Sequence, residues 1–239
     1  MSQDGFLASL SDADADALRS AGVRRTYGGQ VTLVHQDDEA GPVVVLLGGR
    51  AKIAVTEGGR EAIFGVVGPG ELIGELAAIE GSPRSTTVTT LEPVDALVIP
   101  RSDFLGLLNR RPRIALAILR VVARRLRYAD AQRAQYATLD VAGRLAQRLL
   151  ELSERFGDEQ EHRIEIRLPL SQEELASWVG ASREAVSKAF QLLRTLGIVE
   201  TGRRRVTVLD LDALRRQAHW GVAPDGQPVS GARSRPTTP

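Results

Sequence analysis

The stretch from Ser171 to Gly197 reads SQEELASWVGASREAVSKAFQLLRTLG and contains two helix starts close together. Ser171 and Glu174 have the spacing of a capping box, in which each side chain accepts a hydrogen bond from a backbone amide at the helix start. Ser182 can cap a second helix, and Gly197 is placed to end it. Gly180 lies at the tight turn between them. Two short helices joined in this way predict a helix-turn-helix unit.

The second predicted helix has an apolar side and a polar side. Its buried stripe is expected to be Val186, Phe190 and Leu193, because these residues recur at helical spacing. The polar side consists of Arg183, Glu184, Ser187, Lys188, Gln191 and Arg194. Arginine can form a bidentate pair with guanine, and glutamate can accept from the cytosine amino group. The pattern favours recognition of duplex DNA, although a solvated face on an ordinary helical hairpin has the same pattern.

A short hairpin is predicted directly after this helix. Residues 198–200 and 206–208 read as strands, and the turn between them has the sequence TGRRR at 201–205. A hairpin in this position is a wing, and arginines at its tip suit contact with DNA phosphates. A surface turn of arginines without a partner is the alternative.

Length and composition narrow the class of protein. With 239 residues, of which 43% are hydrophobic, the chain can form one large or two ordinary domains with proper cores. Cysteine is absent, which excludes disulfides, a thiolate-held iron–sulfur cluster and a catalytic thiol. No apolar run approaches the ~20 residues of a membrane span, and the N-terminus lacks a signal-peptide pattern. We therefore expect a cytoplasmic protein without a membrane partner.

The net charge of +1 conceals an uneven distribution along the chain. Residues 1–100 hold 7 Lys and Arg against 14 Asp and Glu, whereas residues 101–139 hold 9 against 2. Residues 181–216, which include the second predicted helix and the hairpin, hold 8 against 4. The local excess of positive charge, and not the overall balance, points to a nucleic acid partner.

The region from Val31 to Pro100 contains short segments rich in β-branched residues, separated by glycine turns. The predicted strands are residues 43–47, 51–55, 62–67, 86–90 and 95–99. Short strands at this spacing predict an antiparallel sandwich or barrel. Residues 1–25 precede it, and their leucines, together with Val23 and a capping Ser11, suggest one or two short helices.

One segment interrupts the predicted strands at residues 70–85. Gly74, Glu75 and Leu76 can start a helix of one or two turns, and Arg84 and Ser85 follow a glycine-proline turn. A helix N-terminus and a nearby arginine both attract an anion. A glutamate beside them fits neutral hydroxyl groups, so the set points to a sugar phosphate. A strand-linking turn with a surface Glu–Arg pair is an equally good alternative.

The residues from Pro112 to about Leu139 read as one long helix, with the proline in its first turn. Residues recurring at intervals of 4, 3, 4 and 3 are Ala115, Leu119, Val122, Leu126 and Ala129, and Tyr136 lies one heptad further. This spacing is that of a coiled-coil seam, so it predicts a homodimer through the helix. Packing of the helix on its own domain is the alternative, because the seam is only about three heptads long.

The remaining segments complete the C-terminal part. Residues 139–156 read as a helix that precedes the helix-turn-helix as the first helix of a winged-helix domain. Residues 157–162 read as an acidic, exposed loop, and residues 210–220 as a last short helix. Residues 220–239 are rich in Gly, Pro, Ser and Thr, which predicts a disordered tail.

Four sequence motifs occur in a fixed order along the chain. They are GELA at 74–77 with PRS at 83–85, ARRL at 123–126, LDVAGRLA at 139–146 and VGASREAVSK at 179–188. Over roughly residues 5–215 this order resembles the cyclic-AMP receptor protein / fumarate-and-nitrate regulator (Crp/Fnr) family of bacterial transcription factors. The joint presence of the motifs in the family order is specific, whereas any one of them alone is not.

The resemblance implies an α+β fold. An N-terminal antiparallel β-roll of the cyclic-nucleotide-binding type would occupy residues 1–111, a long dimerisation helix 112–139, and a C-terminal winged helix-turn-helix DNA-binding domain 140–219. The implied ligand is a cyclic nucleotide, cAMP or cGMP, and its site consists of Gly74, Glu75, Leu76, Arg84, Ser85, Ala129 and Asp130. The implied DNA-contacting residues are Ser182, Arg183, Glu184, Ser187, Lys188, Arg203 and Arg204.

The implied partners are a palindromic operator in double-stranded DNA, a second copy of the chain and RNA polymerase; no metal is implied.

Two departures from the family pattern bear on these roles. Cyclic-AMP-responsive members have arginine where this chain has Lys188, and lysine lacks the bidentate geometry. They also have a Thr-Ser or Thr-Asn pair, which contacts adenine, where this chain has Ala129 and Asp130. The phosphate half of the site is therefore expected to be intact and the base half altered, which leaves a ligand-independent member as an alternative.

Two other classes of function compete with a ligand-gated transcription regulator. One is a cyclic-nucleotide-sensing module that regulates a partner protein, which the polar side of the second helix and the arginine-rich turn disfavour. The other is an enzyme, but the sequence contains no P-loop, HExxH or GxSxG motif and no cysteine–histidine pairing. We expect a regulator and not an enzyme.

Overall fold

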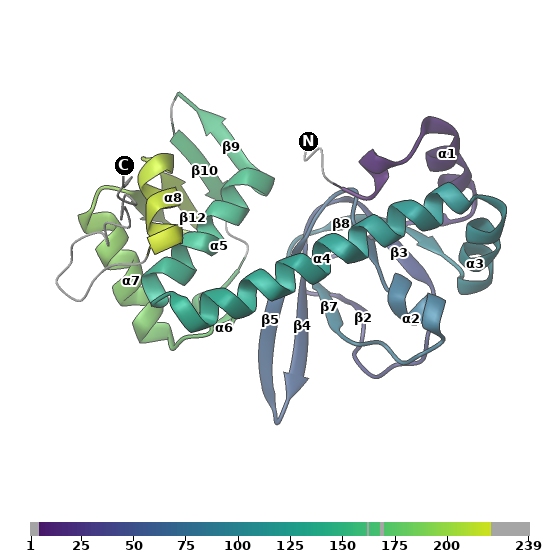
Figure 1. Cartoon of the computed structure of the whole chain (residues 1–239), viewed down its shortest axis with the longest axis horizontal. Coiled ribbons are helices and arrows are strands. Elements are labelled where there is room, and N and C mark those ends of the chain that lie inside the picture. Colours follow the sequence, from purple (N-terminus) through teal and green to yellow (C-terminus); the bar gives the residue numbers. More distant parts are fainter. Residues whose placement is uncertain (1–4, 162, 168–169, 221–239) are drawn as a thin grey trace, which may run out of the picture. The chain divides into compact units, whose positions relative to one another are not determined.

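The computed structural model of this chain describes residues 5–161, 163–167 and 170–220. The chain forms two compact units that divide between Asp130 and Ala131. This boundary lies within the long helix α4 (Pro112–Thr138), which contributes to both units (Figure 1).

The first unit contains two four-stranded antiparallel sheets. One sheet consists, in spatial order, of β1 (Val23–Tyr27), β8 (Val94–Ile99), β3 (Val43–Gly48) and β6 (Leu72–Ile73). The other consists of β2 (Thr32–Val34), β7 (Thr87–Thr90), β4 (Ala51–Glu57) and β5 (Arg60–Val67). The helices of this unit are η1 (Leu7–Ser9), α1 (Asp12–Ser20), α2 (Glu75–Glu80), α3 (Arg101–Arg110) and the first part of α4.

Alternate residues of β3 belong to two different cores, because successive side chains of a strand point to opposite faces. Val44 and Leu46 join the core between the two sheets, together with Val88 of β7. Val43 joins a second core, on the helical side, which includes Ile114 of α4. Strand β3 is therefore buried on both faces over its first four residues, and α4 packs on its helical side.

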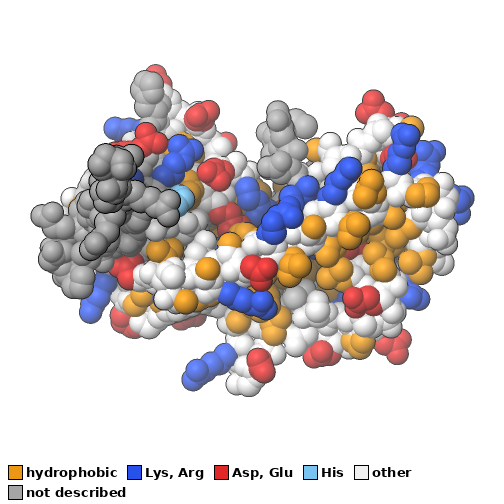
Figure 2. Space-filling model, in the orientation of Figure 1, with side chains coloured by type: hydrophobic (Ala, Val, Ile, Leu, Met, Phe, Trp, Pro, Cys, Tyr) orange, Lys and Arg blue, Asp and Glu red, His pale blue; other side chains and the backbone are white. Residues whose placement is uncertain are grey.

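The first part of α4 has one buried side and one exposed apolar side. Ile114, Ala117 and Ile118 are buried against the roll. Leu119 and Leu126, two members of the predicted seam, are each 62% exposed. Figure 2 shows hydrophobic side chains gathered along this helix on the face in view. A folded monomer rarely leaves large apolar side chains in such a row on one helix.

The second unit is a winged helix. Its elements after α4 are α5 (Val141–Phe156), β9 (Gly157–Gln160), β10 (Arg163–Arg167), α6 (Gln172–Val179), α7 (Arg183–Thr195), β11 (Val199–Gly202), β12 (Arg205–Val208) and α8 (Leu211–Trp220). The strands form one antiparallel sheet in the order β11-β12-β10-β9. Leu145 and Leu149 of α5, Trp178 of α6 and Leu193 of α7 are fully buried.

The local chemistry of the helix-turn-helix matches the sequence prediction. Ser171 and Glu174 form the capping box at the start of α6, and Ser182 accepts from the amide of Ala185 at the start of α7. Gly180 ends α6 with a φ of 66°, in the left-handed region that favours glycine. The predicted α+β class is confirmed, with an antiparallel roll, a long helix and a winged helix-turn-helix.

Several predictions of individual elements were wrong or incomplete. Strands β1, β2 and β6 and helix α3 were not predicted, and Val23 begins a strand and not a helix. Residues 157–160 form β9, because their backbone pairs with β10 in place of the expected loop. Phe190 is only partly buried in α7, whereas Ala189 is buried.

Two further predictions meet the limits of the described residues. The predicted tail lies outside them, apart from residue 220 at the end of α8. The predicted domain boundaries at 111 and 139 stay predictions. Within the described parts of the chain, no helix is long and apolar enough to cross a membrane.

Candidate functional site

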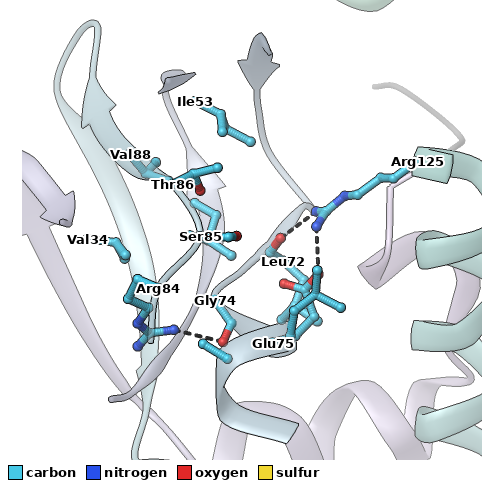
Figure 3. A pocket seen from close by; sticks show the side chains of 13 residues that line it. Val34, Ile53, Leu72, Gly74, Glu75, Arg84, Ser85, Thr86, Val88 and Arg125 are labelled. Atoms are coloured by element: carbon cyan, nitrogen blue, oxygen red, sulfur yellow. Dashed lines mark hydrogen bonds and ion pairs between the residues drawn. The ribbon is translucent and has the colours of Figure 1, made fainter. Parts of the chain in front are cut away.

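The first unit contains a pocket at the start of α2 with about 420 Å³ of unfilled space, part of which is open to solvent. Apolar residues of three strands form one wall, among them Val34, Ile53 and Val88. The polar side chains come from three places: Glu75 lies in α2, Arg84, Ser85 and Thr86 lie between α2 and β7, and Arg125 lies in α4 (Figure 3).

Gly74 is the N-cap of α2 and has a φ of 82°, so the chain turns sharply into the helix there. Glu75, the first residue of α2, is only 1% exposed. A carboxylate at this depth requires charged or hydrogen-bonded partners, because the loss of hydration is otherwise too costly. Its partner comes from another element of the same unit.

Arg125 of α4 is that partner. Its Nη1 donates to Oε1 of Glu75 at 2.6 Å, and its Nη2 donates to the carbonyl of Leu72 at 2.6 Å (Figure 3). The sequence prediction treated Arg125 as one of the arginines around the seam and so missed it. A signal was present, because Ile114, Ile118 and Val121 precede Arg125 at intervals of 4, 3 and 4 and form the buried side of α4.

Arg84 is the other cation of the pocket, and it is buried, with an exposed fraction of 5%. Its Nη1 donates to the carbonyl of Gly74 at 2.7 Å and its Nη2 to the carbonyl of Pro42 at 2.7 Å. Burial lowers the pKa of Arg84, while the negative charges of Asp38 and Glu75 act in the opposite direction. An arginine remains protonated under these conditions, so the pocket offers a fixed positive charge.

The structure brings together five of the seven predicted ligand residues. Gly74, Glu75, Leu76, Arg84 and Ser85 all line the pocket. The left-handed backbone at Gly74 favours glycine there, and a Cβ at this position would also contact Nη1 of Arg84. Leu76 is 40% exposed and Ser85 is exposed.

The two other predicted ligand residues, Ala129 and Asp130, do not line the pocket of the single chain. They lie on exposed positions of α4, at the end of the first unit. A ligand can therefore contact these two residues only with a part that extends beyond this pocket.

The second candidate site is the exposed side of α7. The predicted residues Ser182, Arg183, Glu184, Ser187 and Lys188 are all exposed and occupy the first two turns. Hydrogen bonds from its own backbone amide and from Ser182 hold the pKa of Glu184 below its usual value, so its carboxylate is ionised at neutral pH. The first turn of α7 therefore presents both a cation and an anion.

Arg183 is held by a residue that the sequence prediction did not include. Its Nε donates to Oε1 of Gln172, the first residue of α6, at 3.0 Å. This contact leaves Nη1 and Nη2, the outer edge of the guanidinium, for a bidentate pair with a base. The spacing of 11 residues hides the contact from sequence periodicity, because the two helices meet only in the folded turn.

The wing is the hairpin of β11 and β12, with Arg203 and Arg204 at its turn. Arg204 has a φ of 55°, and both arginines are exposed. Near the turn of the hairpin, Arg194 of α7 donates to Oγ1 of Thr201 at 2.9 Å, which ties the wing to the helix. Two exposed cations thus lie on a hairpin that is fixed relative to α7.

A roll that encloses a charged pocket, joined by a long helix to a winged helix-turn-helix, defines a DNA-binding regulator with a ligand-sensing domain. The sequence matches the family of the cyclic nucleotide-binding domain over residues 24–111 and that of the Crp-like helix-turn-helix domain over residues 143–217. The chain belongs to the Crp/Fnr family of transcription regulators, which are not enzymes.

Several known proteins are similar over most of their length. The CRP-like cAMP-activated global transcriptional regulator of Mycobacterium tuberculosis is 33% identical over 188 residues, which cover 78% of this chain and 84% of that protein. The cyclic AMP receptor protein of Thermus thermophilus is 30% identical over 215 residues, with coverages of 90% and 96%. The crystal structure of a CRP-family transcriptional regulator from Thermus thermophilus has a TM-score of 0.68 at 27% identity, with coverages of 81% and 96%.

The ion pair between Glu75 and Arg125 leads to the first prediction. Arg125→Met leaves a buried carboxylate unpaired and should destabilise the first unit by about 2–3 kcal/mol, less than a fully buried pair because Arg125 is 37% exposed. Adding Glu75→Gln should restore about half of the loss, because the uncompensated charge is then gone. Urea denaturation of the two single variants and the double variant measures this, and additive losses would contradict the prediction.

Proposed function

We propose that this protein is a dimeric transcription regulator that reads its operator in the major groove and is gated by a cyclic nucleotide bound in the roll. The observation that carries the proposal is the pocket in which Arg84, Glu75 and Arg125 meet, since the last of these residues belongs to α4. A ligand in the pocket therefore acts on the helix that leads to the DNA-binding unit.

The polar groups of the pocket suit the two parts of a cyclic sugar phosphate. Arg84 uses two of its five N–H groups on backbone carbonyls and keeps the others for phosphate oxygens. Ser85 adds a hydroxyl donor beside it. Glu75 accepts hydrogen bonds only, so it fits a neutral ribose hydroxyl and repels a phosphate. The names of the relatives from M. tuberculosis and T. thermophilus support cAMP as one candidate.

Asp130 bears on whether the proposed ligand carries adenine or guanine. An ionised aspartate accepts from the adenine amino group or from N1 and N2 of guanine, and Ala129 has no polar side chain. We propose weaker preference for adenine than in relatives with two hydroxyl or amide side chains there. A ligand-independent regulator is the outcome if neither nucleotide binds.

Gating follows from competition for Glu75. In this structure its carboxylate accepts a hydrogen bond from Nη1 of Arg125 at 2.6 Å. A ribose hydroxyl that donates to Glu75 alters this ion pair, and with it the forces on α4. A ligand shifts an equilibrium only by its differential affinity for the two states, and the shared carboxylate provides that difference.

Dimerisation through α4 is proposed from the exposed seam. Leu119 and Leu126 lie one heptad apart and are each 62% exposed. Pairing two such helices removes these side chains from water. A dimer with two-fold symmetry matches a palindromic operator, with one recognition helix for each half-site. Contact with RNA polymerase is part of the proposal by family resemblance alone.

The dimer can be tested with a matched pair of charge changes. Leu126→Glu lies on the seam, whereas Arg120→Gln lies away from it on the same helix, and each lowers the charge by one. The first should weaken association by about 100-fold or more, since two leucines each lose roughly 1.5 kcal/mol of burial. Sedimentation equilibrium measures the mass. A wild-type monomer at micromolar concentration would refute the proposed dimer.

Base reading and phosphate contact predict different responses to mutation. Arg183→Ala should cost about 1–3 kcal/mol per half-site and relax the preference at one base pair. Arg204→Ala should weaken all DNA sequences alike and make the salt dependence shallower. Fluorescence anisotropy with operator and random duplexes at several salt concentrations separates the two. Equal weakening of both duplexes by Arg183→Ala would show that it is not a base reader.

Ligand gating is tested by calorimetric titration with cAMP and with cGMP, and by operator affinity with and without each. Arg84→Leu should abolish the response to ligand and leave basal, non-specific DNA binding intact, because Arg84 supplies the charge that meets the phosphate. Arg101→Leu is the matched control. Arg101 also holds a carbonyl of α2, that of Ala78 at 2.9 Å, but it does not line the pocket. Unchanged operator affinity of the wild type with both nucleotides would refute gating by them.

A further inference from the structure

The loop between β2 and β3, residues 35–42, makes three hydrogen bonds with Arg84. The backbone amide of Arg84 donates to the carbonyl of Asp38 at 2.8 Å, and the amide of Asp37 donates to the carbonyl of Arg84 at 2.8 Å. Nη2 of Arg84 donates to the carbonyl of Pro42 at 2.7 Å. The loop therefore holds both the backbone and the guanidinium of this arginine.

The backbone of the loop follows the arginine closely. Asp37 has a φ of 69°, a left-handed conformation that aspartate adopts more readily than most residues other than glycine. A Cβ on Gly41 would lie 3.3 Å from Nη2 of Arg84, which is a tight contact. The loop thus belongs structurally to the ligand site, although it was not predicted to take part in it.

The same loop is acidic, because Asp37, Asp38 and Glu39 are consecutive. All three side chains are exposed, and none of them lines the pocket. The ligand proposed for the pocket is an anion, which three neighbouring carboxylates repel. Their place beside Arg84 therefore needs an explanation other than contact with the ligand.

An empty pocket leaves Arg84 with a buried charge to compensate. The residue is only 5% exposed, and a cation at this depth loses most of its hydration. Both hydrogen bonds of its side chain go to carbonyls, which are uncharged. Burial lowers the pKa of Arg84, and the charge of Asp38, followed by that of Glu75, acts in the opposite direction. Asp38 thus compensates the guanidinium from outside the pocket.

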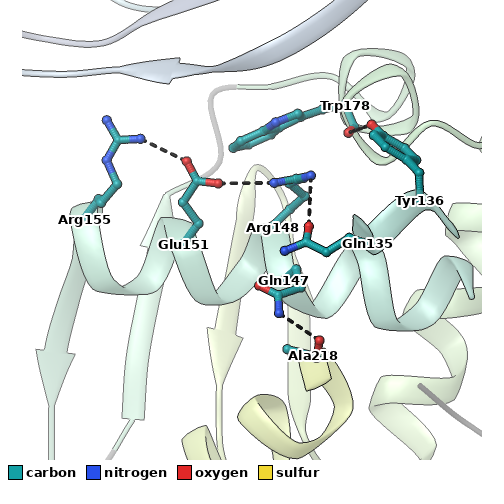
Figure 4. A network of polar contacts seen from close by, with 8 residues as sticks. All are labelled: Gln135, Tyr136, Gln147, Arg148, Glu151, Arg155, Trp178 and Ala218. Atoms are coloured by element: carbon teal, nitrogen blue, oxygen red, sulfur yellow. Dashed lines mark hydrogen bonds and ion pairs between the residues drawn. The ribbon is translucent and has the colours of Figure 1, made fainter. Parts of the chain in front are cut away.

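Among the residues that the structure describes, Arg148 is the other buried arginine, with an exposed fraction of 2%, and its charge is balanced in a different way. Its Nη1 lies 3.5 Å from Oε2 of Glu151, and its guanidinium lies 5.5 Å from the centre of the ring of Trp178 (Figure 4). The counter-charge of Arg148 is therefore close to it within the same unit. Asp38 acts on Arg84 through space, so an anion that binds in the pocket can take its place.

We propose that Asp38 sets the affinity of the ligand site, because its carboxylate stabilises the empty pocket and opposes the binding of an anionic ligand. A phosphate group that reaches Arg84 supplies the same compensation at closer range, and Asp38 then only repels it. One charge therefore has opposite effects on the stability of the ligand-free roll and on ligand affinity. The inference rests on the proposed anionic ligand and extends the site to a loop outside the pocket.

The size of the effect follows from the exposure of the loop. An exposed carboxylate acts through a medium of high effective dielectric constant and is screened by salt, so we expect it to change ligand affinity by about 3-fold at low salt. A change of this size leaves the pocket functional. It shifts the concentration of ligand at which half of the sites are filled, and with it the level of ligand to which the regulator responds.

The first test compares Asp38→Asn with Glu39→Gln in the full-length protein by calorimetric titration with cAMP and with cGMP. Each variant removes one exposed negative charge from the loop and keeps the backbone carbonyl, but only Asp38 acts appreciably on Arg84. At low salt, Asp38→Asn should bind the nucleotide about 3-fold more tightly than wild type, and Glu39→Gln should stay close to wild type. In about 1 M salt, where the Debye length is ~3 Å, the difference should vanish. Unchanged or weaker binding in Asp38→Asn, or an equal gain in both variants, would overturn the proposal.

The second test measures thermal unfolding of the same variants at low salt, with inorganic phosphate as a probe of the pocket. Both variants relieve the crowding of carboxylates in the loop, so the difference between them reports the compensation of Arg84. Without phosphate, Asp38→Asn should unfold at a lower temperature than Glu39→Gln. Addition of phosphate should raise the unfolding temperature more in Asp38→Asn than in Glu39→Gln. Equal unfolding temperatures and equal responses to phosphate would contradict the assigned role.

The two tests also separate this inference from the proposed gating. Thermal unfolding with phosphate needs no cyclic nucleotide, so the role of Asp38 is tested even if wild type binds neither nucleotide, an outcome that would refute the gating. Nucleotide binding that does not respond to Asp38→Asn would leave the proposed function in place and overturn this inference alone.

Discussion

The burial of Glu75 is the constraint on which the ligand-sensing half of this protein depends. A carboxylate that is 1% exposed needs a cation, and the structure supplies it from Arg125 on another element at 2.6 Å. Through this ion pair the first turn of α2 determines the position of α4, which also packs on the roll through Ile114 and Ile118. The pocket and the long helix thus share one ion pair, which is the contact on which the proposed gating depends.

In the second unit an arginine likewise satisfies polar groups that would otherwise lack a partner, and here these groups are backbone carbonyls. There the ends of α4 and α6 expose carbonyl groups, and a single side chain, Arg144, binds both ends. Arginine suits this role because its planar fork offers five donors in fixed directions, which a lysine cannot do. In both units a guanidinium joins helices or turns that are distant in sequence, so these arginines are not interchangeable with lysine.

The sequence predicted the parts of the fold that depend on local chemistry. The capping box of Ser171, the cap of Ser182 and the turn at Gly180 each depend on a few neighbouring residues, and all three are present. Strands β1 and β2 were missed because their stability comes from pairing with β8 and β7, far along the chain. Their own sequences have no clear alternation of apolar and polar residues.

The candidate site could be predicted only where a motif placed its residues close together. Arg84 and Glu75 were found in this way, whereas Arg125 and Gln172 were missed because each meets its partner only after folding. An arginine on the buried side of a helix is a signal that sequence periodicity can detect, since it breaks an apolar stripe. The hydrogen bond from Arg183 to Gln172 leaves no comparable trace in the sequence.

The charges around Arg84 also affect how well the pocket would hold a ligand after its phosphate ring is opened. Two cations, Arg84 and Arg125, line the pocket together with one anion, Glu75, so the lining has a net charge of +1. Such a balance suits a phosphodiester, which carries one negative charge. Opening the ring produces a monoester whose second ionisation, with a pKa of about 6, adds a further negative charge near Glu75. If the proposed cyclic nucleotide binds here, opening of its ring would therefore also weaken the electrostatic fit between the product and the pocket.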